Sequence, residues 1–409
     1  MAHPTNILSG KQIVLGVCGS IAAYKVAQLA RDLTLAGAQV DVILTAAAAR
    51  FVGPATFQAL TGRPVLDDLW ELPEDGVVGH ITLGSQADAL LIAPATAHTI
   101  ARIAAGFSDD LLTTTLLATR APVLLAPAMN PLMYEHPATQ ANLALLRTRG
   151  YHLLEPGVGR MAEHVSGKGR LPEPATIEGE LRALLGRTTG PLRGRRLVVT
   201  AGPTREPIDP VRYVGNRSSG QMGYAIAAQA RDLGAAVTLI SGPTALTPPA
   251  AVDLIAVETA LQMQEAVEHA SVGADMLIMN AAVADFRPAT AAEQKLKKTP
   301  TTHGMTLEMV TNPDIIAGLA HRHDLFKVGF AAETDDLLAN AQSKLLRKGL
   351  DMIVANDAVT SISQPAITLT IIDREGVVTL DRHPKTEAAA ILMAAIVERF
   401  QRRLAQQGQ

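Results

Sequence analysis

Two segments of this chain share one layout, which restricts the folds that the chain can adopt. Each has a short β-branched apolar run, a Gly/Ser-rich turn, an amphipathic stretch and a second apolar run; they cover Lys11 to Thr45 and Arg195 to Gly242. Helically spaced apolar residues between two runs of buried-strand character are typical of a strand–helix–strand unit. The alternation continues after each segment. The sequence therefore predicts an α/β chain of two Rossmann-like domains with mainly parallel sheets between helices.

Three stretches of the chain lack this apolar periodicity. Leu185 to Arg196 is rich in Gly, Pro and Arg, so we place the domain boundary there, which gives domains 1–188 and 189–409. Glu155 to Pro174 is dense in Gly and Pro, and Arg287 to Thr302 is polar and rich in Lys. Loops this long inside a compact domain are either disordered or functional.

Charge and composition exclude several classes of protein. The net charge of -3 predicts no strong attraction to nucleic acid or anionic membranes. The single cysteine, Cys18, excludes an intramolecular disulfide and a Cys-based zinc site. The most apolar stretch, Ala87 to Ala105, contains charged residues and a proline, and the first residues do not resemble a signal peptide. We therefore expect a cytoplasmic protein without a membrane partner.

Polar residues follow several predicted strands of the first domain. Gly19 and Ser20 come directly after a strand and open a helix, where backbone N–H groups and the helix dipole favour an anion. Thr45, Thr96 and Asn130 each end a later strand. Open α/β sheets bind ligands at these carboxyl ends. The turn is not GxGxxG, however, and by itself it is equally consistent with a tight strand–helix connection.

Five motifs of this domain resemble the flavin-dependent cysteine decarboxylases, which include the phosphopantothenoylcysteine decarboxylases of coenzyme A biosynthesis. They are GSIAAYK (19–25), GHI (79–81), APATA (93–97), AGFSDDLL (105–112) and PAMN (127–130). The resemblance implies a flavodoxin-like layered flavoprotein domain. It also implies that FMN lies over Gly19, Ser20, Thr45, Thr96 and Met129. His80 would handle protons during thiol oxidation, and Asn130 would hold the carboxylate that leaves as carbon dioxide. From the sequence alone, a lone histidine such as His80 is more often structural than catalytic.

The domain departs from this family at one position. The family's loop after PAMN carries a cysteine that protonates the enethiolate intermediate, but Glu163 stands there in this chain and His164 follows it. Two interpretations stay open. Either Glu163 or His164 supplies the proton as a general acid, or the domain binds FMN with little or no decarboxylase turnover.

The segment Thr200 to Gly223 carries the chemistry of the second domain. A strand ends near Gly202, but the next helix begins only around Ser218, which is too long a connection for a nicotinamide dinucleotide turn. Ser218, Ser219 and Gly220 offer hydroxyl and N–H groups to a phosphate chain at the helix start. Asn216 precedes them and could bind a carboxylate or acyl oxygen. The same residues could also be a simple helix cap.

A lysine-rich loop follows later, with Lys295, Lys297 and Lys298. Such a run is usually solvated surface charge. Cations on a loop are also what a developing polyphosphate leaving group needs.

In their order along the chain, these two stretches and three further motifs resemble the phosphopantothenate–cysteine ligases. The further motifs are NAAVADFRP (280–288), NPDI (312–315) and GFAAET (329–334). The resemblance implies that CTP converts 4'-phosphopantothenate to an acyl-cytidylate, which cysteine then attacks. It places Asn216 at the acyl intermediate and Lys295 and Lys298 over the phosphates, with Mg²⁺ on the triphosphate. It places four further residues near the nucleotide base and ribose: Asp285, Asn312, Asp314 and Phe330.

Together the two resemblances imply a bifunctional enzyme that makes 4'-phosphopantetheine. The alternative is an active ligase fused to a flavin-binding domain with weak or no decarboxylase turnover. The fused ligase disfavours a flavin prenyltransferase for the first domain. The related decarboxylases form trimers with FMN between subunits, and the ligases form dimers, so the resemblance implies a homo-oligomer that combines both symmetries, a dodecamer.

Overall fold

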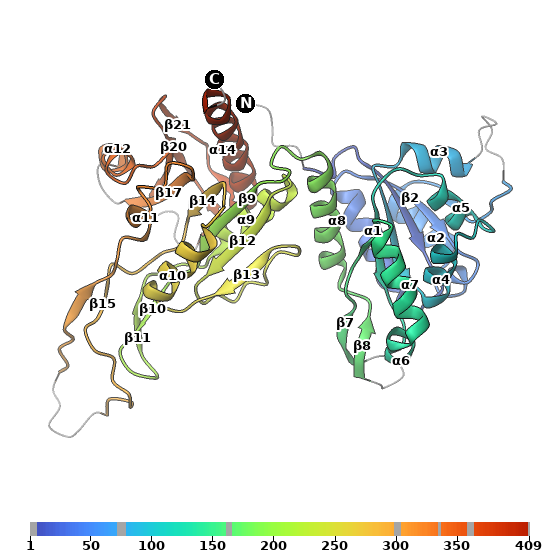
Figure 1. Cartoon of the computed structure of the whole chain (residues 1–409), viewed down its shortest axis with the longest axis horizontal. Coiled ribbons are helices and arrows are strands. Elements are labelled where there is room, and N and C mark those ends of the chain that lie inside the picture. The colour runs from blue at the N-terminus through green and yellow to red at the C-terminus, as the bar shows by residue number, and fades with distance from the viewer. Residues whose placement is uncertain are drawn as a thin grey trace. The chain divides into compact units, whose positions relative to one another are not determined.

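The computed structural model describes residues 6–71, 79–160, 166–297, 304–333, 337–357 and 364–407, without the side chains of 332–333, 337–341, 357 and 407. These residues form two compact units that divide between Thr188 and Thr189. Each unit is a mixed α/β structure with a largely parallel sheet (Figure 1). The predicted fold class is confirmed.

The first unit contains a six-stranded parallel sheet in the order β3-β2-β1-β4-β5-β6. This order reverses direction between β1 and β4, and open α/β sheets bind ligands outside the strand ends at such a switch point. The strands are β1 Gln12–Val17, β2 Gln39–Leu44, β3 Val65–Leu66, β4 Ala89–Ala95, β5 Val123–Pro127 and β6 His152–Leu153.

Helices cover both faces of this sheet. Side chains alternate along β1, so that Ile13 and Leu15 pack against α1 and α8, whereas Val14 packs on the opposite face with residues of α4, α5 and α7. The helices are α1 Ala23–Leu35, α2 Pro54–Thr61, α3 Gly79–Gln86, α4 Ala97–Ala105, α5 Leu111–Leu117, α6 Pro131–Glu135, α7 Pro137–Thr148 and α8 Pro174–Thr189, with a short 3-10 turn at Ala48–Arg50.

The Gly- and Pro-rich stretch of this unit is not wholly irregular. Two strands, β7 Gly157–Arg160 and β8 Ser166–Arg170, pair in antiparallel fashion within it. Their glycines hid the alternation of side chains that marks a strand. Residues 161–165, which include Glu163 and His164, connect the two strands and lie outside the described residues.

The second unit repeats the strand order of the first. Its sheet runs β13-β12-β9-β14-β17-β18-β20-β21, in which the first six strands are parallel and the last two are antiparallel. The switch point therefore lies between β9 and β14. The strands are β9 Arg196–Ala201, β12 Ala236–Ser241, β13 Asp253–Ala256, β14 Met276–Met279, β17 Phe326–Glu333, β18 Met352–Asp357, β20 Thr370–Ile372 and β21 Val377–Thr379.

Both faces of this second sheet are also covered. Val199 of β9 packs in one apolar cluster with residues of α9 and α14, and its neighbour Val198 packs in another with residues of α10. The helices are α9 Gln221–Asp232, α10 Ala260–Ala270, α11 Ile315–Gly318, α12 Leu337–Arg347 and α14 Lys385–Gln407.

Three short antiparallel pairs complete the second unit. Two of them, β10 with β11 and β15 with β16, extend from the carboxyl ends of β9 and β14 (Figure 1). The pairs are β10 Arg205–Pro207 with β11 Tyr213–Gly215, β15 Phe286–Pro288 with β16 Met309–Thr311, and β19 Ala366–Ile367 with β22 His383–Pro384. Across the described residues, no helix combines the length and apolar character needed to span a membrane.

Candidate active sites

A cavity of about 1090 Å³ lies at the carboxyl ends of the central strands of the first unit. Six of the residues predicted from sequence line it together: Gly19, Ser20, Thr45, Thr96, Met129 and Asn130. They follow β1, β2, β4 and β5, which are neighbours around the switch point. The predicted convergence of strand ends is therefore present in the structure.

Gly19 has a steric role in this cavity. A Cβ atom built on Gly19 would stand 2.5 Å from the Cβ of Ala47, which follows β2. The loops after β1 and β2 therefore approach as closely as they do only because position 19 carries no side chain. This close approach forms a backbone cradle at the beginning of α1.

The hydroxyl groups of the cavity are fixed by local hydrogen bonds. Ser20 Oγ accepts from the N–H of Ala22 at 3.3 Å, and Thr45 Oγ1 donates to the carbonyl of Val17 at 3.1 Å. Thr96 caps α4 by accepting from the N–H of Thr99 at 3.3 Å. These bonds hold the strand ends in place without using the full acceptor and donor capacity of the hydroxyls.

Positive side chains that were not selected from the sequence also line the cavity. They are Lys25, Arg102, Arg160 and Arg170. Arg102 forms ion pairs with Asp109 and with Asp110, the latter at 2.6 Å. Burial acts to raise the pKa of Asp110, but hydrogen bonds from Thr113 and Arg102 outweigh it and lower the pKa.

Lys25 and Arg170, two of the other three cations, share the carboxylate of Glu173. Lys25 Nζ lies 3.0 Å and Arg170 Nη2 lies 2.7 Å from Glu173 Oε1. Two cations on one anion leave excess positive charge beside the cavity, which suits an anionic ligand. Ion pairs between residues 148 positions apart leave no local sequence signal.

Apolar side chains complete the lining of this cavity. Ile21, Tyr24, Phe51 and Met133 are each at least half exposed and lie around it. Such side chains cover a flat ring system well. The cradle at Gly19, the cations and these apolar groups together fit a phosphate-bearing aromatic cofactor such as FMN.

The β7–β8 hairpin is tied to the segment that carries Asn130. The N–H of Met129 donates to the carbonyl of Gly169 at 2.9 Å, and a Cβ on Gly167 would lie 2.7 Å from Pro131. Asn130 begins α6, and its Oδ1 accepts from the N–H of Leu132 at 3.0 Å.

His80 does not line the cavity of its own chain. It lies in α3, half-buried, and its Nδ1 atom is buried without a hydrogen-bond partner among the described residues. A buried polar atom without a partner costs free energy and calls for an explanation.

Cys18 is fully buried behind the cavity wall. Burial raises the pKa of its thiol to about 11, against weaker lowering by hydrogen bonds to Thr99 and Thr96. Cys18 is therefore a neutral, packed side chain.

In the second unit, two loops meet at the switch point. The N–H of Ala282 donates to the carbonyl of Gly202 at 2.9 Å, and the N–H of Ala284 donates to Thr204 Oγ1 at 3.0 Å. Asn216 Nδ2 donates to the carbonyl of Val283 at 2.9 Å. The predicted acyl-binding residue therefore lies against the segment that leads to Asp285.

The start of α9 packs closely against this junction. Gly220, at a φ of 74°, caps the helix, and its N–H donates to Ser218 Oγ at 3.3 Å. A Cβ on Gly220 would lie 2.7 Å from a methyl carbon of Thr244 and 3.4 Å from the nitrogen of Gly202. Ser218 and the neighbouring Ser219 are half-buried at this helix start.

Two of the four residues predicted to contact the base and ribose, Asn312 and Asp314, have side chains that bond within the protein. Asn312 donates through Nδ2 to the carbonyl of Ala284 at 2.8 Å and accepts from Arg287 at 3.0 Å. Its N–H donates to the carbonyl of Asp285 at 2.8 Å. These bonds tie the segment after β16 to the segment after β14.

Asp314 caps α11 by accepting from Ala317 N–H at 3.2 Å and pairs with Lys348 at 2.8 Å. Phe330 lies half-buried in β17.

Lys295 is exposed on the segment that follows β15. Its neighbour Leu296 donates its N–H to Asp209 Oδ2 at 3.2 Å. Asp209, which sequence reasoning did not select, is 3% exposed. Lys298 lies outside the described residues.

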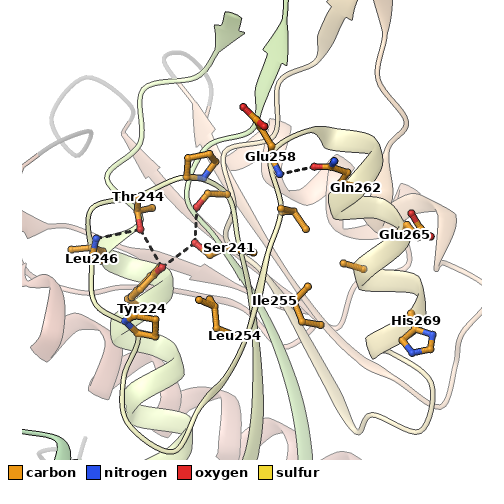
Figure 2. A pocket seen from close by; sticks show the side chains of 16 residues that line it. Tyr224, Ser241, Thr244, Leu246, Leu254, Ile255, Glu258, Gln262, Glu265 and His269 are labelled. Carbon is orange, nitrogen blue, oxygen red and sulfur yellow. Dashed lines mark hydrogen bonds between the residues drawn. The ribbon is translucent and has the colours of Figure 1, made fainter. Parts of the chain in front are cut away.

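A separate crevice of about 880 Å³ lies over β12 and β13, beside α10 (Figure 2). Its hydroxyls form a chain in which Thr244 donates to Tyr224, Tyr224 to Ser241, and Ser241 to the carbonyl of Gly242. The described residues predicted to bind nucleotide are not part of its lining. Nor do the described residues contain a cluster of His, Cys, Asp and Glu that could hold a metal ion.

The similarity to known proteins extends over nearly the whole chain. The flavoprotein family model matches residues 1–186, and that of the DNA/pantothenate metabolism flavoprotein C-terminal domain matches residues 192–400. The coenzyme A biosynthesis bifunctional protein CoaBC of Vibrio cholerae is 47% identical over 96% of this chain and 99% of its own length. That of Mycobacterium tuberculosis is 50% identical over 85% of this chain and 86% of its own.

A crystal structure of the C-terminal domain of a CoaBC protein is also similar to this chain. It is 39% identical, covers 52% of this chain and 99% of that structure, and has a TM-score of 0.45.

Proposed function

Because this chain belongs to the family of coenzyme A biosynthesis bifunctional proteins, we propose that it makes 4'-phosphopantetheine from 4'-phosphopantothenate, cysteine and CTP. The family is bifunctional, with a phosphopantothenoylcysteine decarboxylase and a phosphopantothenate–cysteine ligase. In the proposed sequence of reactions, the second unit acts first and supplies the substrate of the first unit.

The second unit carries out the ligation in two steps. The carboxylate of 4'-phosphopantothenate attacks the α-phosphorus of CTP, brought with Mg²⁺ on its phosphates, and pyrophosphate leaves. The amine of cysteine then attacks the acyl carbon, and CMP leaves with the bonding electrons. The observation that supports this reaction is the convergence of Asn216, the α9 start at Gly220 and the segment before Asp285 at one switch point.

Each group of residues has a defined part in this proposal. Ser218, Ser219 and Gly220 hold the phosphates at the start of α9, and Lys295 with Lys298 neutralises the departing pyrophosphate. Asn216 holds the acyl oxygen through its carboxamide.

The base and ribose region has its own assigned residues. Asp285 and Phe330 border this part of the nucleotide. Asn312 and Asp314 shape the pocket rather than reach into it, because their side chains already bond to the protein.

The first unit is the decarboxylase, with FMN as its cofactor. Gly19 and Ser20 would hold the phosphate, and Thr45, Thr96 and Met129 would border the rest of the cofactor. FMN held there would take two electrons from the cysteinyl thiol, so that the resulting thioaldehyde can stabilise decarboxylation, and would return them to the decarboxylated product, so that no external oxidant is consumed. Asn130 orients the carboxylate, and Glu163 or His164 delivers the final proton.

His80 supports an oligomer in which subunits complete one another's sites. It is assigned to proton transfer, yet it does not line the cavity of its own chain, and its Nδ1 is buried without a partner among the described residues. A trimeric contact of first units would bring a second chain's cavity to His80. Combined with dimeric second units, this contact gives the proposed dodecamer, which a mass measurement in solution tests. The cytoplasmic location stays a prediction.

Purified full-length protein decides between the two readings of the first unit. With 4'-phosphopantothenate, cysteine and CTP, the proposal expects CMP, pyrophosphate, carbon dioxide and 4'-phosphopantetheine in equal amounts. Glu163 in place of the family's cysteine favours one alternative, an active ligase fused to a flavin-binding unit. Yellow protein that stops at 4'-phosphopantothenoylcysteine would establish that alternative instead.

A further inference from the structure

We propose that Asp209 is a positioning residue of the ligase, which fixes where Lys295 stands by anchoring the segment that carries it. This inference rests on the proposed function of the second unit. The anchored segment, residues 289–297, is called the lysine segment below. Asp209 lies at the tip of the β10–β11 hairpin, between Pro207 and Tyr213.

Asp209 is a buried carboxylate with donors on both oxygens. Oδ1 accepts from the backbone N–H groups of Val211 and Arg212, each at 2.9 Å. Oδ2 accepts from the N–H of Leu296 at 3.2 Å and lies 3.1 Å from Nε of Arg212. One carboxylate therefore orders its own turn and also holds a segment 87 residues away in the sequence.

Two further bonds join the same partners. The N–H of Ala292 donates to the carbonyl of Ile208 at 2.9 Å, and Arg212 donates to the carbonyl of Leu296. The lysine segment itself has no helix or strand that would fix its path. The position of Lys295 therefore depends on the bonds between the lysine segment and the hairpin tip, and Asp209 makes the central one.

The carboxylate is matched to this role by its charge. Burial acts to raise the pKa of Asp209, but hydrogen bonds from the N–H groups of Val211, Leu296 and Arg212 outweigh it and lower the pKa. The ionised form accepts from all its donors at once, which a protonated carboxyl or a shorter side chain cannot do. Without it, three partly buried N–H groups lose their acceptor.

The test is a double-mutant cycle on the full chain, read as CTP-dependent release of pyrophosphate. Asp209→Ala is expected to lower kcat about 10- to 100-fold, as displacement of a catalytic group does. The KM for CTP should change much less. In a Lys295→Gln background, Asp209→Ala should lower kcat by less than twofold, because the group that it positions is already gone.

Asp373 provides a matched control in the same unit. It accepts from the N–H groups of Glu375 at 2.8 Å and Gly376 at 3.0 Å and pairs with Arg399, in the turn between β20 and β21. Its loss also removes the acceptor of two backbone N–H groups and the partner of an arginine, but it makes none of these contacts with the lysine segment. In the double variant, any fold-decrease in kcat caused by Asp373→Ala should therefore multiply with that caused by Lys295→Gln, as expected for independent sites.

Two outcomes separate this inference from the proposed function. If the fold-decreases in kcat caused by Asp209→Ala and Lys295→Gln multiply in the double variant, as those of Asp373→Ala and Lys295→Gln should, Asp209 is merely structural and the inference is overturned. If wild-type protein releases no pyrophosphate, the proposed ligase function itself fails. Should Asp209→Ala not fold, Asp209→Asn keeps an acceptor oxygen. Asp209→Asn is expected to lower kcat less than Asp209→Ala, and its effect should also nearly vanish in the Lys295→Gln background. If the two effects multiplied instead, the inference would equally be overturned.

Discussion

The backbone N–H of Met129 donates a hydrogen bond to the carbonyl oxygen of Gly169 at 2.9 Å. This bond joins the segment after β5 to strand β8, and both residues line the cavity of the first unit. Arg160, the last residue of β7, lines it as well. The two strands that flank residues 161–165 are therefore anchored at the cavity. Whether Glu163 can do the work of the family's cysteine can be tested by mutation.

Glu163→Gln should separate decarboxylation from the final protonation. If Glu163 is the acid, the variant still releases carbon dioxide but accumulates the oxidised thiol product, because glutamine cannot donate an acidic proton. Formation of 4'-phosphopantetheine is expected to fall about 100-fold or more. Mass spectrometry of the products measures both. A loss seen in His164→Gln but not in Glu163→Gln would transfer the role to His164.

Gly19→Ala should weaken cofactor binding in the first unit. The added methyl would stand 2.5 Å from the Cβ of Ala47, and relieving such a contact costs about 1–3 kcal/mol. Bound flavin per chain, measured by absorbance, should fall roughly tenfold at limiting FMN.

Two further variants test that steric explanation. Gly53→Ala is the control, because its Cβ would meet no atom within 4 Å. The double variant Gly19→Ala/Ala47→Gly should regain part of the flavin, since it removes the methyl contact at 2.5 Å but leaves the backbone carbonyl of residue 47 at 3.0 to 3.2 Å from the new methyl. Failure of this rescue would contradict the steric role of Gly19.

Backbone-determined features of the sites could be predicted from the sequence. Gly19 and Ser20 follow an apolar strand run directly, so their position at the carboxyl edge of the sheet is a consequence of chain order. Side-chain partnerships could not. The bonds of Asp209 to Leu296 and of Lys25 to Glu173 join residues far apart in the chain, and only the folded path of the intervening segments brings them together.

Sequence patterns also do not tell whether a polar side chain serves a ligand or the protein. Asn312 and Asp314 stand in a motif that suggested direct nucleotide contacts, but each already bonds to neighbouring segments. Their part in binding stays a prediction.

Asn216→Asp should block the cysteine-dependent step of ligation. The carboxamide donates to the carbonyl of Val283 at 2.9 Å, whereas an aspartate would be repelled by that carbonyl and by the acyl phosphate. Release of pyrophosphate should continue while the acyl-cytidylate accumulates, and amide formation should fall about 100-fold. Asn142→Asp on α7 of the first unit is the control. Equal loss of both steps would show that Asn216 serves binding in general.

Cys18 should resist alkylation in the folded protein. Burial raises the pKa of its thiol to about 11, so the thiol is neutral and enclosed at pH 8. Mass spectrometry after iodoacetamide treatment should find Cys18 unmodified in buffer and fully modified in denaturant. By linkage, its packing contributes stability that is complete below the unfolded pKa of about 8.5 and declines as pH rises towards 11. Rapid modification without denaturant would contradict its enclosed position.

Lys327 should stabilise the segment that directly follows helix α11. Its buried Nζ donates to the carbonyls of Leu319 at 3.1 Å and Arg322 at 3.0 Å, so Lys327→Met should cost about 2–4 kcal/mol in unfolding free energy. Burial lowers the pKa of Lys327, so the unfolded chain binds its proton more tightly. The wild type therefore gains stability as pH rises towards 10.5, the ordinary value, and the variant does not. Urea unfolding at pH 7 and pH 9.5 should show this gap widening, with exposed Arg374→Met within about 0.5 kcal/mol of wild type at both. A gap that narrows with pH would mean that the folded protein favours the charged lysine.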